Sequence, residues 1–393
     1  MKNISLIFIA AMIGLAGVNV AMAADAPEKK SVLSNIDIQV YGYIKLDAIF
    51  DTSRVYPGNY AIYVKQEGPY NDDNQLNITA NQTRLGLNLS GPEAAGAKTA
   101  GKVEMDFYGP GGTENKGLLM MRQAYLELTW TDLNLGLLAG QAWDVFAPML
   151  PDAVNYSVWE GTGEVGYRHP QLRLTGNFKV GEKSSLNAKV ALSRNMGHTV
   201  TVTSTDSGTD SGMPHVQGSL TFTSPLWTSA PAILCLSGVW GREEYDVNTQ
   251  NIDFKTYPVW GGAIDVQLPL VDGATLKGSA WKGANLETYI GGLTQGISTT
   301  RGESVHTKGG WVCLGLGPMA STKFNLGGTI EMAQWDQIPN GWRSQNNAVW
   351  GNAIHNLTSN IQVALEIAQI RTQYKNSKEG DAARTQLAFI YNF

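Results

Sequence analysis

The feature that most constrains this 393-residue chain is a period of two in the polarity of its residues. Near the start, Val40, Ile44 and Leu46 share one parity, whereas Lys45 and Asp47 share the other. Such a period is typical of a β-strand with one apolar and one polar face. About sixteen segments of this kind are separated by turn signals, at residues 36–50, 74–90, 97–108, 118–131, 133–142, 164–180, 184–195, 214–224, 231–243, 252–268, 273–288, 306–317, 322–336, 346–357, 360–374 and 381–393. The pattern predicts an all-β chain.

Residues 1–23 predict a secretory signal peptide. Lys2 precedes an apolar run over residues 4–20, and Ala21 and Ala23 supply the small side chains that the cleavage site needs. The run is shorter than the roughly 20 residues of a membrane-spanning helix, although an uncleaved anchor is the alternative. We expect residues 24–35 to be a short flexible lead and residues 36–393 to be the folded part.

No later apolar run approaches membrane-spanning length. An exported chain of this kind can span a membrane only as a closed β-barrel, because in lipid every backbone polar group must be hydrogen-bonded within the protein. Long and short connections also alternate along the chain. We therefore predict a transmembrane antiparallel β-barrel of about 16 strands, with long extracellular loops and short periplasmic turns.

A secreted soluble β-protein is the competing interpretation, and composition weighs against it. Charged residues make up 16% of the chain, against roughly 25% in soluble domains. Many positions on the polar faces are Asn, Gln, Thr, Ser or Gly, as expected for a wet lumen. Tryptophans near strand ends would form the aromatic girdles at the two membrane interfaces; they are Trp130, Trp227, Trp240, Trp260, Trp335 and Trp350. The net charge of −5 and the scattered basic residues exclude nucleic acid as a partner.

The functional site of a channel is its constriction, where pore width and fixed charge decide what passes. The best candidate for a loop that narrows the pore is the third long connection, residues 144–163, whose prolines and aromatic side chains indicate a compact loop. Its candidate residues are Pro148, Pro151, Asp152, Tyr156, Trp159 and Glu160. The alternative is a loop that packs outside, on a neighbouring subunit or over the mouth.

Parity predicts which charged side chains face the lumen near this loop. The basic candidates are Lys45, Arg84, Lys102, Arg173 and Lys189, and the acidic candidates are Asp47, Glu104, Asp106 and Glu127. Such a mixed wall would create a transverse field, with Arg suited to holding carboxylates. The alternative is that these groups neutralise one another in structural networks. Arg122 has the parity of the lipid side, which a β-bulge or a position at the rim could explain, and we do not assign it to the pore.

Other chemistry is poorly supported. The five histidines, at positions 169, 198, 215, 306 and 355, have no metal-ligand spacing, so we expect neither a metal nor a cofactor. A barrel enzyme would need a Ser–His pair, for which the candidates are Ser193 or Ser211 with His198 or His215, but no nucleophile motif surrounds them. We expect no enzymatic activity. A non-conducting barrel that binds a partner remains the main alternative to a channel.

Several segments together resemble the DcaP-like outer-membrane porins over about residues 41–177. They are YGYIKLDA at 41–48, RLGL at 84–87, GKVEMDFY at 101–108, RQAYLEL at 122–128, LAGQAW at 138–143 and RHPQLR at 168–173. The last residues, AFIYNF, are similar to the C-terminal signal of outer-membrane barrels. The resemblance implies a homotrimer in the outer membrane of a Gram-negative-type bacterium, with pores that favour small organic anions such as dicarboxylates. With only residues 24–35 before the first strand, the helical extension of some members is not expected. The predicted function is passive diffusion of small hydrophilic solutes across that bilayer.

Overall fold

A computed structural model describes residues 35–109, 112, 116–196, 207–246, 254–298 and 300–393. Asp37–Phe393 form one compact unit. The predicted signal peptide and all but the last residue of the predicted lead lie outside the described residues and stay predictions. Within the described part of the chain, no helix is long and apolar enough to cross a membrane.

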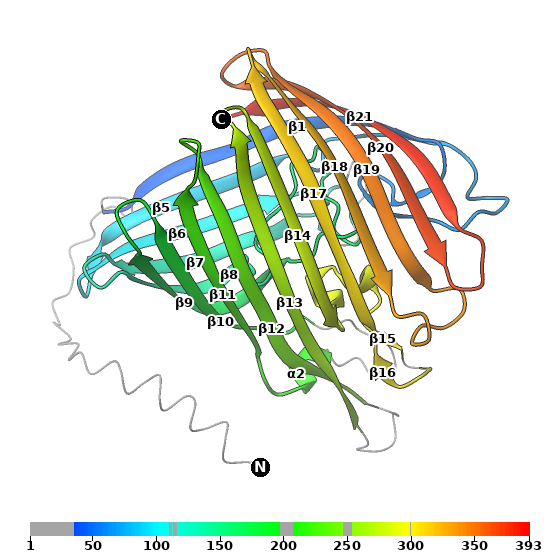
Figure 1. Ribbon diagram of the computed structural model, residues 1–393, viewed down its shortest axis with the longest axis horizontal. Coiled ribbons are helices and arrows are strands. Elements are labelled where there is room, and N and C mark those ends of the chain that lie inside the picture. Colours follow the sequence, from blue (N-terminus) through cyan, green and yellow to red (C-terminus); the bar gives the residue numbers. More distant parts are fainter. Residues whose placement is uncertain (1–34, 110–111, 113–115, 197–206, 247–253, 299) are drawn as a thin grey trace. The chain divides into compact units, whose positions relative to one another are not determined.

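The compact unit is a closed antiparallel β-barrel of 16 strands (Figure 1). Strand β1 closes it by pairing with β5 on one side and with β21 on the other. The second barrel strand is interrupted at residues 80–83 and consists of β4 and β5. The strands are β1 (Asp37–Asp51), β4 (Gln75–Thr79), β5 (Arg84–Ala94), β6 (Ala97–Asp106), β7 (Met120–Trp130), β8 (Leu135–Trp143), β9 (Arg168–Lys179), β10 (Ser185–Ser193), β11 (His215–Pro225), β12 (Pro231–Asp246), β13 (Phe254–Val271), β14 (Ala274–Ala284), β17 (His306–Met319), β18 (Thr322–Ala333), β19 (Arg343–Asn356), β20 (Ile361–Tyr374) and β21 (Gly380–Asn392). The predicted architecture is confirmed.

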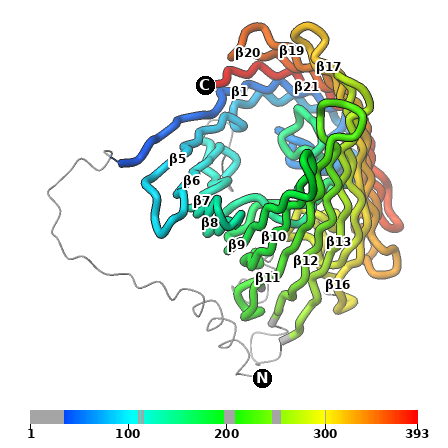
Figure 2. The backbone as a smooth tube through the Cα atoms, turned by 60° about the vertical axis from the view of Figure 1, so that its left-hand side comes forward, coloured from blue at the N-terminus to red at the C-terminus, as the bar shows by residue number. Residues whose placement is uncertain are grey.

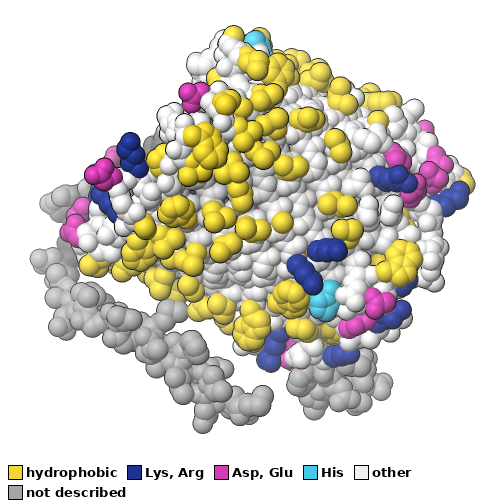
Figure 3. Space-filling view, viewed as in Figure 1, with side chains coloured by type: hydrophobic (Ala, Val, Ile, Leu, Met, Phe, Trp, Pro, Cys, Tyr) yellow, Lys and Arg dark blue, Asp and Glu magenta, His cyan; other side chains and the backbone are white. Residues whose placement is uncertain are grey.

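The two faces of the wall are inverted relative to a soluble protein. On β1, Val40 and Ile44 are 59% and 56% exposed, whereas Lys45 and Asp47 are 3% and 1% exposed. The same inversion continues around the barrel, and one side of it shows mainly hydrophobic side chains among uncharged ones (Figure 3). An apolar outer face and a polar inner face are what a barrel in lipid requires.

Connections of two to five residues join the strands at one end. At the other end, the connection between β20 and β21 has five residues and the others have seven or more. Three of the long loops are named L1, L3 and L6. L1 is residues 52–74 and contains the hairpin β2 (Val55–Pro57) and β3 (Ala61–Val64). L3 is residues 144–167. L6 is residues 285–305, with η1 (Glu287–Tyr289), η2 (Gly292–Thr294), β15 (Ile297–Ser298) and β16 (Glu303–Ser304).

L1, L3 and L6 fold into the barrel and hold one another there. Figure 2 shows the chain of L1 and L3 inside the ring of strands. Ala61 of L1 exchanges hydrogen bonds with the Asn155 side chain of L3, at 3.0 and 3.2 Å. The Gly166 N–H of L3 donates to the Tyr289 carbonyl of L6 at 2.9 Å. The interior is therefore occupied by three interlocked loops, where the sequence predicted one.

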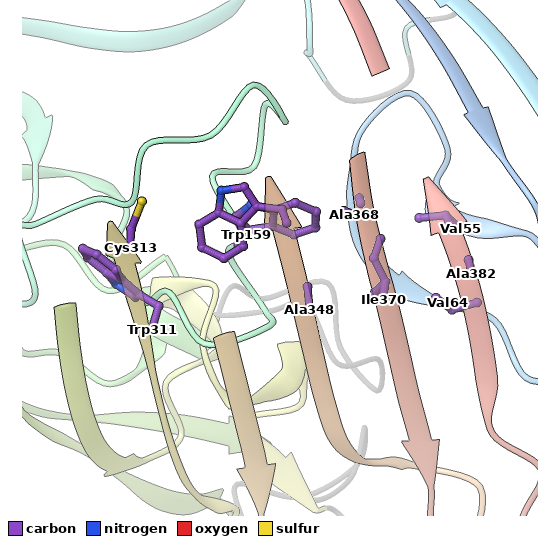
Figure 4. Close-up of a cluster of buried hydrophobic side chains, with 11 residues drawn as sticks. Val55, Val64, Trp159, Trp311, Cys313, Ala348, Ala368, Ile370 and Ala382 are labelled. Atoms are coloured by element: carbon purple, nitrogen blue, oxygen red, sulfur yellow. The ribbon is translucent and has the colours of Figure 1, made fainter. Parts of the chain in front are cut away.

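An apolar cluster fills the space between these loops and the wall of β17–β21 (Figure 4). Trp159 of L3 lies against Trp350 of β19, with ring centroids 5.4 Å apart, and both are fully buried. Ala368, Ile370 and Ala382 of β20 and β21 complete the contact. Trp350 is therefore not part of an interfacial girdle, and that prediction was wrong. Its position near a strand end in the sequence did not show that its side chain is on the inner face.

A close backbone approach seats the end of L3. A Cβ on Gly163 would overlap the Gly310 carbonyl of β17 and lie 2.9 Å from both the Ile330 nitrogen and oxygen of β18. The Gly163 carbonyl also accepts a hydrogen bond from Trp281 Nε1 at 2.7 Å. Only glycine fits between L3 and the wall at this position.

We expect Gly163→Val to unseat L3, because the added side chain meets backbone atoms that cannot rotate away. The variant should give noisy, flickering conductance in single-channel recordings and lose its folded electrophoretic mobility at a lower temperature. Gly68→Val in L1 is the matched control, since a Cβ there meets nothing within 4 Å. Recordings of Gly163→Val that match those of Gly68→Val would refute this role for the seat.

Candidate functional site

L3 crosses the interior because groups from distant strands hold its backbone. The N–H groups of Val154 and Asn155 donate to the two carboxylate oxygens of Glu366 on β20, at 2.7 and 3.0 Å. The Val154 carbonyl accepts from Lys45 Nζ on β1 at 3.0 Å. At the start of the loop, Asp144 contacts His169 Nδ1 at 2.9 Å. L3 thus packs against β17–β21 and faces the opposite wall.

A cavity of about 230 Å³ separates L3 from that opposite wall. It is lined by basic and aromatic side chains of β1, β5, β7, β8 and β9, by L1 and L3, and by Ile290 of L6. Its charged members are Arg84, Arg122, Arg168 and Glu160, and its aromatic members are Tyr43, Tyr60, Tyr108, Trp143, Tyr156 and Tyr167. This cavity between loop and wall is the candidate functional site.

Arg122 lies inside the barrel, contrary to its parity in the sequence. The register between β6 and β7 shifts between Glu104 and Met105, and the bulge at this point turns both Arg122 and Gln123 inward. Arg122 Nε is 2.9 Å from Glu104 Oε1, and Arg122 Nη1 is 2.9 Å from Asp106 Oδ2. One guanidinium therefore bridges two carboxylates.

Arg84 adds a second cation to the same group. Its nitrogens lie 3.9 Å from Glu104 and 4.0 Å from Asp106, longer than hydrogen bonds. Its Nε has no hydrogen-bond partner among the described residues. Because the two carboxylates are already bound by Arg122, Arg84 keeps hydrogen-bonding capacity toward the cavity.

Arg168 is the cation that the sequence analysis did not select. It is 3% exposed, and its guanidinium lies 4.6 Å from the ring centroid of Trp143 and 4.3 Å from that of Tyr167. Within the described part of the chain its side chain makes no ion pair or hydrogen bond, so aromatic faces are its contacts. Its parity on β9 is that of Pro170 and Leu172, which point outward, so alternation alone could not have identified it.

The other lumen charges lie apart from this cavity. Lys45 Nζ is 3.2 Å from Asp47, and both are buried beside L3. Lys102 Nζ lies over the Tyr41 ring, at 4.9 Å. Glu127, Arg173 and Lys189 are half-buried and follow one another across β7, β9 and β10, nearer to the turns. Arg173 Nη1 donates to the carbonyl of Trp143, the last residue of β8, at 3.4 Å.

The candidate residues of the loop have different positions. Tyr156 and Glu160 line the cavity, and the Tyr156 hydroxyl donates to Asp106 at 2.8 Å. Trp159 anchors the loop instead. Asp152 is paired with Lys277 at 2.7 Å and lines a second cavity of about 500 Å³, on the turn side of L3. Pro151 is buried and Pro148 is exposed, and neither lines the first cavity.

Burial raises the pKa of Glu160 to about 7, while the guanidiniums of Arg168 and Arg122 oppose the shift. Glu164, also in L3, is buried more deeply, and burial together with the charge of Glu160 raises its pKa well above the ordinary value. Glu160 therefore changes charge near neutral pH, within a cavity that contains three permanent cations.

The described Ser–His candidates do not form a nucleophile. Ser193 Oγ is hydrogen-bonded to Gln217, and Ser211 Oγ donates to backbone carbonyls. His215 Nδ1 is bonded to the Tyr289 hydroxyl at 2.9 Å. His198 lies outside the described residues.

Comparisons with known proteins agree with this geometry. The sequence model of the DcaP outer membrane protein family matches residues 18–191. No curated protein matches. Among solved structures, the outer membrane channel DcaP of Acinetobacter baumannii is similar at 20% identity, with a TM-score of 0.73 over 94% of this chain and 100% of that one.

Two further porin structures share the fold. An anion-selective porin from Comamonas acidovorans matches at 9% identity and a TM-score of 0.60, over 91% of this chain and 100% of that one. The trimer form of OmpT of Vibrio cholerae matches at 12% identity and a TM-score of 0.58, with the same coverage. Porin channels are generally non-enzymatic. Residues 18–191 thus match the DcaP outer membrane protein family, and the chain as a whole has the fold of an integral outer-membrane porin.

Proposed function

We propose that this porin is a passive diffusion channel that favours small organic anions, such as dicarboxylates, and that it is exported by its signal peptide and works as a homotrimer. The observation that carries the proposal is the unpaired Arg168 guanidinium in the cavity between L3 and the wall. An unpaired cation that faces a water-filled path attracts anions and repels cations.

The charge balance of the cavity supports the anion preference. Arg84 and Arg122 lie beside Glu104 and Asp106 on the wall, and Arg168 lines the same cavity. Three guanidiniums against two carboxylates leave one positive charge in excess while Glu160 is protonated. Two of the guanidiniums, Arg84 and Arg168, retain free donors, and guanidinium donors match carboxylate geometry. A solute with two carboxylates could use both.

Two structural relatives support the proposed anion preference and the proposed trimer. One is an anion-selective porin, and the other is the trimer form of OmpT. The alternative is a non-conducting barrel that binds a partner, and the three inward loops favour it because they occupy much of the interior. Conductance of the purified protein in a planar bilayer separates the two, since a partner-binding barrel would be silent although folded.

Replacing Arg168 by Gln should reduce the preference for anions without closing the pore. A unit charge about 6 Å from a passing ion in water stabilises an anion and destabilises a cation by roughly 0.7 kcal/mol each, which corresponds to about a tenfold change in the ratio of anion to cation permeability. The reversal potential under a salt gradient measures this ratio. Arg371→Gln is the control, because Arg371 is exposed and paired with Glu379 outside the lumen. Equal reversal potentials for the two variants would show that Arg168 does not act on ions.

The anion preference should fall as the pH rises through about 7. Below this pH, Glu160 is protonated and neutral, and above it the new negative charge offsets one of the three guanidiniums. The charged groups that face it are Arg168 on β9 and Arg122 on β7, which stay positive throughout, and Glu164 within L3. Reversal potentials between pH 5 and about 9 should show this decline. Glu160→Gln should keep the low-pH selectivity at every pH; a decline that persists in this variant would assign the effect to another group.

A further inference from the structure

Two lysines point outward from the wall, where the sequence pattern requires apolar side chains. Lys282 on β14 and Lys308 on β17 are direct register partners. Each is the third residue from the loop end of its strand, and each is exposed. Side chains of directly opposite residues on one face lie about 5 Å apart at Cβ, so the two ammonium groups can reach the same ligand.

Among the described residues, neither lysine has a counter-charge. Their other register partners are Gly262 on β13 and Met332 on β18, and within the described part of the chain neither ammonium forms an ion pair or a hydrogen bond. The surface of these strands in Figure 3 shows few charged side chains. Unpaired charges on the lipid face of a barrel are costly, least so near the interface with the headgroups.

Aromatic residues mark that interface beside the lysines. Trp240 and Trp260 are register partners on β12 and β13, and both have the outward parity. Trp260 and His306 are in edge contact, with centroids 5.9 Å apart, and His306 lies two residues from Lys308 on the same face. Tryptophans of this kind lie at the level of lipid headgroups. Long lysine side chains can extend from the wall to that level.

An apolar groove continues from the lysine pair along the same three strands. It has a volume of about 260 Å³, and the outward side chains that line it are Ile264, Val266, Leu268, Leu276, Ala280 and Val312. From Lys282 toward the turn end of β14, the next residue on the same face is Ala280. The one after it is Gly278, which has no side chain to fill the groove. Its dimensions and polarity suit a hydrocarbon chain.

We propose that Lys282 and Lys308 bind the phosphate of a phosphorylated acyl lipid of the outer leaflet, and that the groove along β13, β14 and β17 holds one of its acyl chains. The charge, the position at the loop end of the wall and the adjoining groove favour a lipid over free phosphate, which would have no use for the groove. The bound lipid supplies the counter-charge that the described part of the chain does not provide at this point.

The test measures binding of diphosphorylated lipid A to the purified, folded protein in mild detergent, by native mass spectrometry. Lys282→Gln/Lys308→Gln should weaken binding about tenfold or more, because two charge-assisted contacts are lost. Lys179→Gln/Lys183→Gln, which removes two exposed lysines at the turn end, is the control with the same change in net charge and should bind normally. Lys282→Arg/Lys308→Arg should also bind, which would show that the loss is not a folding defect.

Two further measurements separate the parts of the site. Ala280→Phe fills the groove and should weaken lipid binding although both lysines remain. Lipid A stripped of its phosphates should bind to the unchanged protein as weakly as intact lipid binds to the lysine-to-glutamine variant. Equal binding of lipid by the two double-glutamine variants would overturn the proposal, and so would displacement of the lipid by inorganic phosphate at low millimolar concentration.

Discussion

The constraint on which the structure depends is that no backbone polar group can face lipid unpaired. Closure of the sheet satisfies it: Gly42 of β1 exchanges hydrogen bonds with Phe393, at 3.0 and 3.1 Å, and so joins the two ends of the sheet. Once the sheet is closed, each strand has one face in lipid and one in the lumen. The burial of Lys45 and Asp47 and the exposure of Val40 and Ile44 follow from this closure.

The two sides of the barrel interior differ, since one side anchors the inward loops and the other lines the cavity. The wall of β17–β21 anchors L1 and L3 through Glu366, Trp350 and the apolar cluster around them. The opposite wall, from β1 to β9, carries the three guanidiniums that line the cavity, together with the rings of Tyr43 and Trp143. L3 is therefore held on one side of the cavity, and the guanidiniums lie on the other.

The ionisable groups of the cavity differ in how far their charges are paired within the protein. Arg122 is held by Glu104 and Asp106 and so stabilises the wall, whereas Arg168 contacts mainly aromatic faces and lines the cavity without an ion pair among the described residues. Glu160 stands between them, with a pKa near neutrality because burial and the nearby guanidiniums act in opposite directions. On the outer face, Lys282 and Lys308 form no ion pair with any residue that the structure describes.

Much of the site could be predicted, because in a regular strand the parity of a residue determines whether its side chain lies on the inner or the outer face of the barrel. Arg84, Glu104 and Asp106 were placed toward the lumen on this basis, and the structure has them there. Arg122 was not assigned to the lumen, because a β-bulge shifts parity by one residue and leaves no local signal in the composition. Tyr60 of L1 and Ile290 of L6 were not predicted to line the cavity, because the length of a loop does not reveal whether it folds inward.

The amino-acid sequence by itself determined the class of fold, the number of barrel strands and the inner and outer faces, since each follows from alternation within short segments and from the demands of lipid. Tertiary structure alone decided which loops enter the barrel and which cations stay unpaired. Those outcomes depend on contacts between residues far apart in the chain, such as Glu366 with Val154 and Gly163 with Gly310, and no local pattern encodes such contacts.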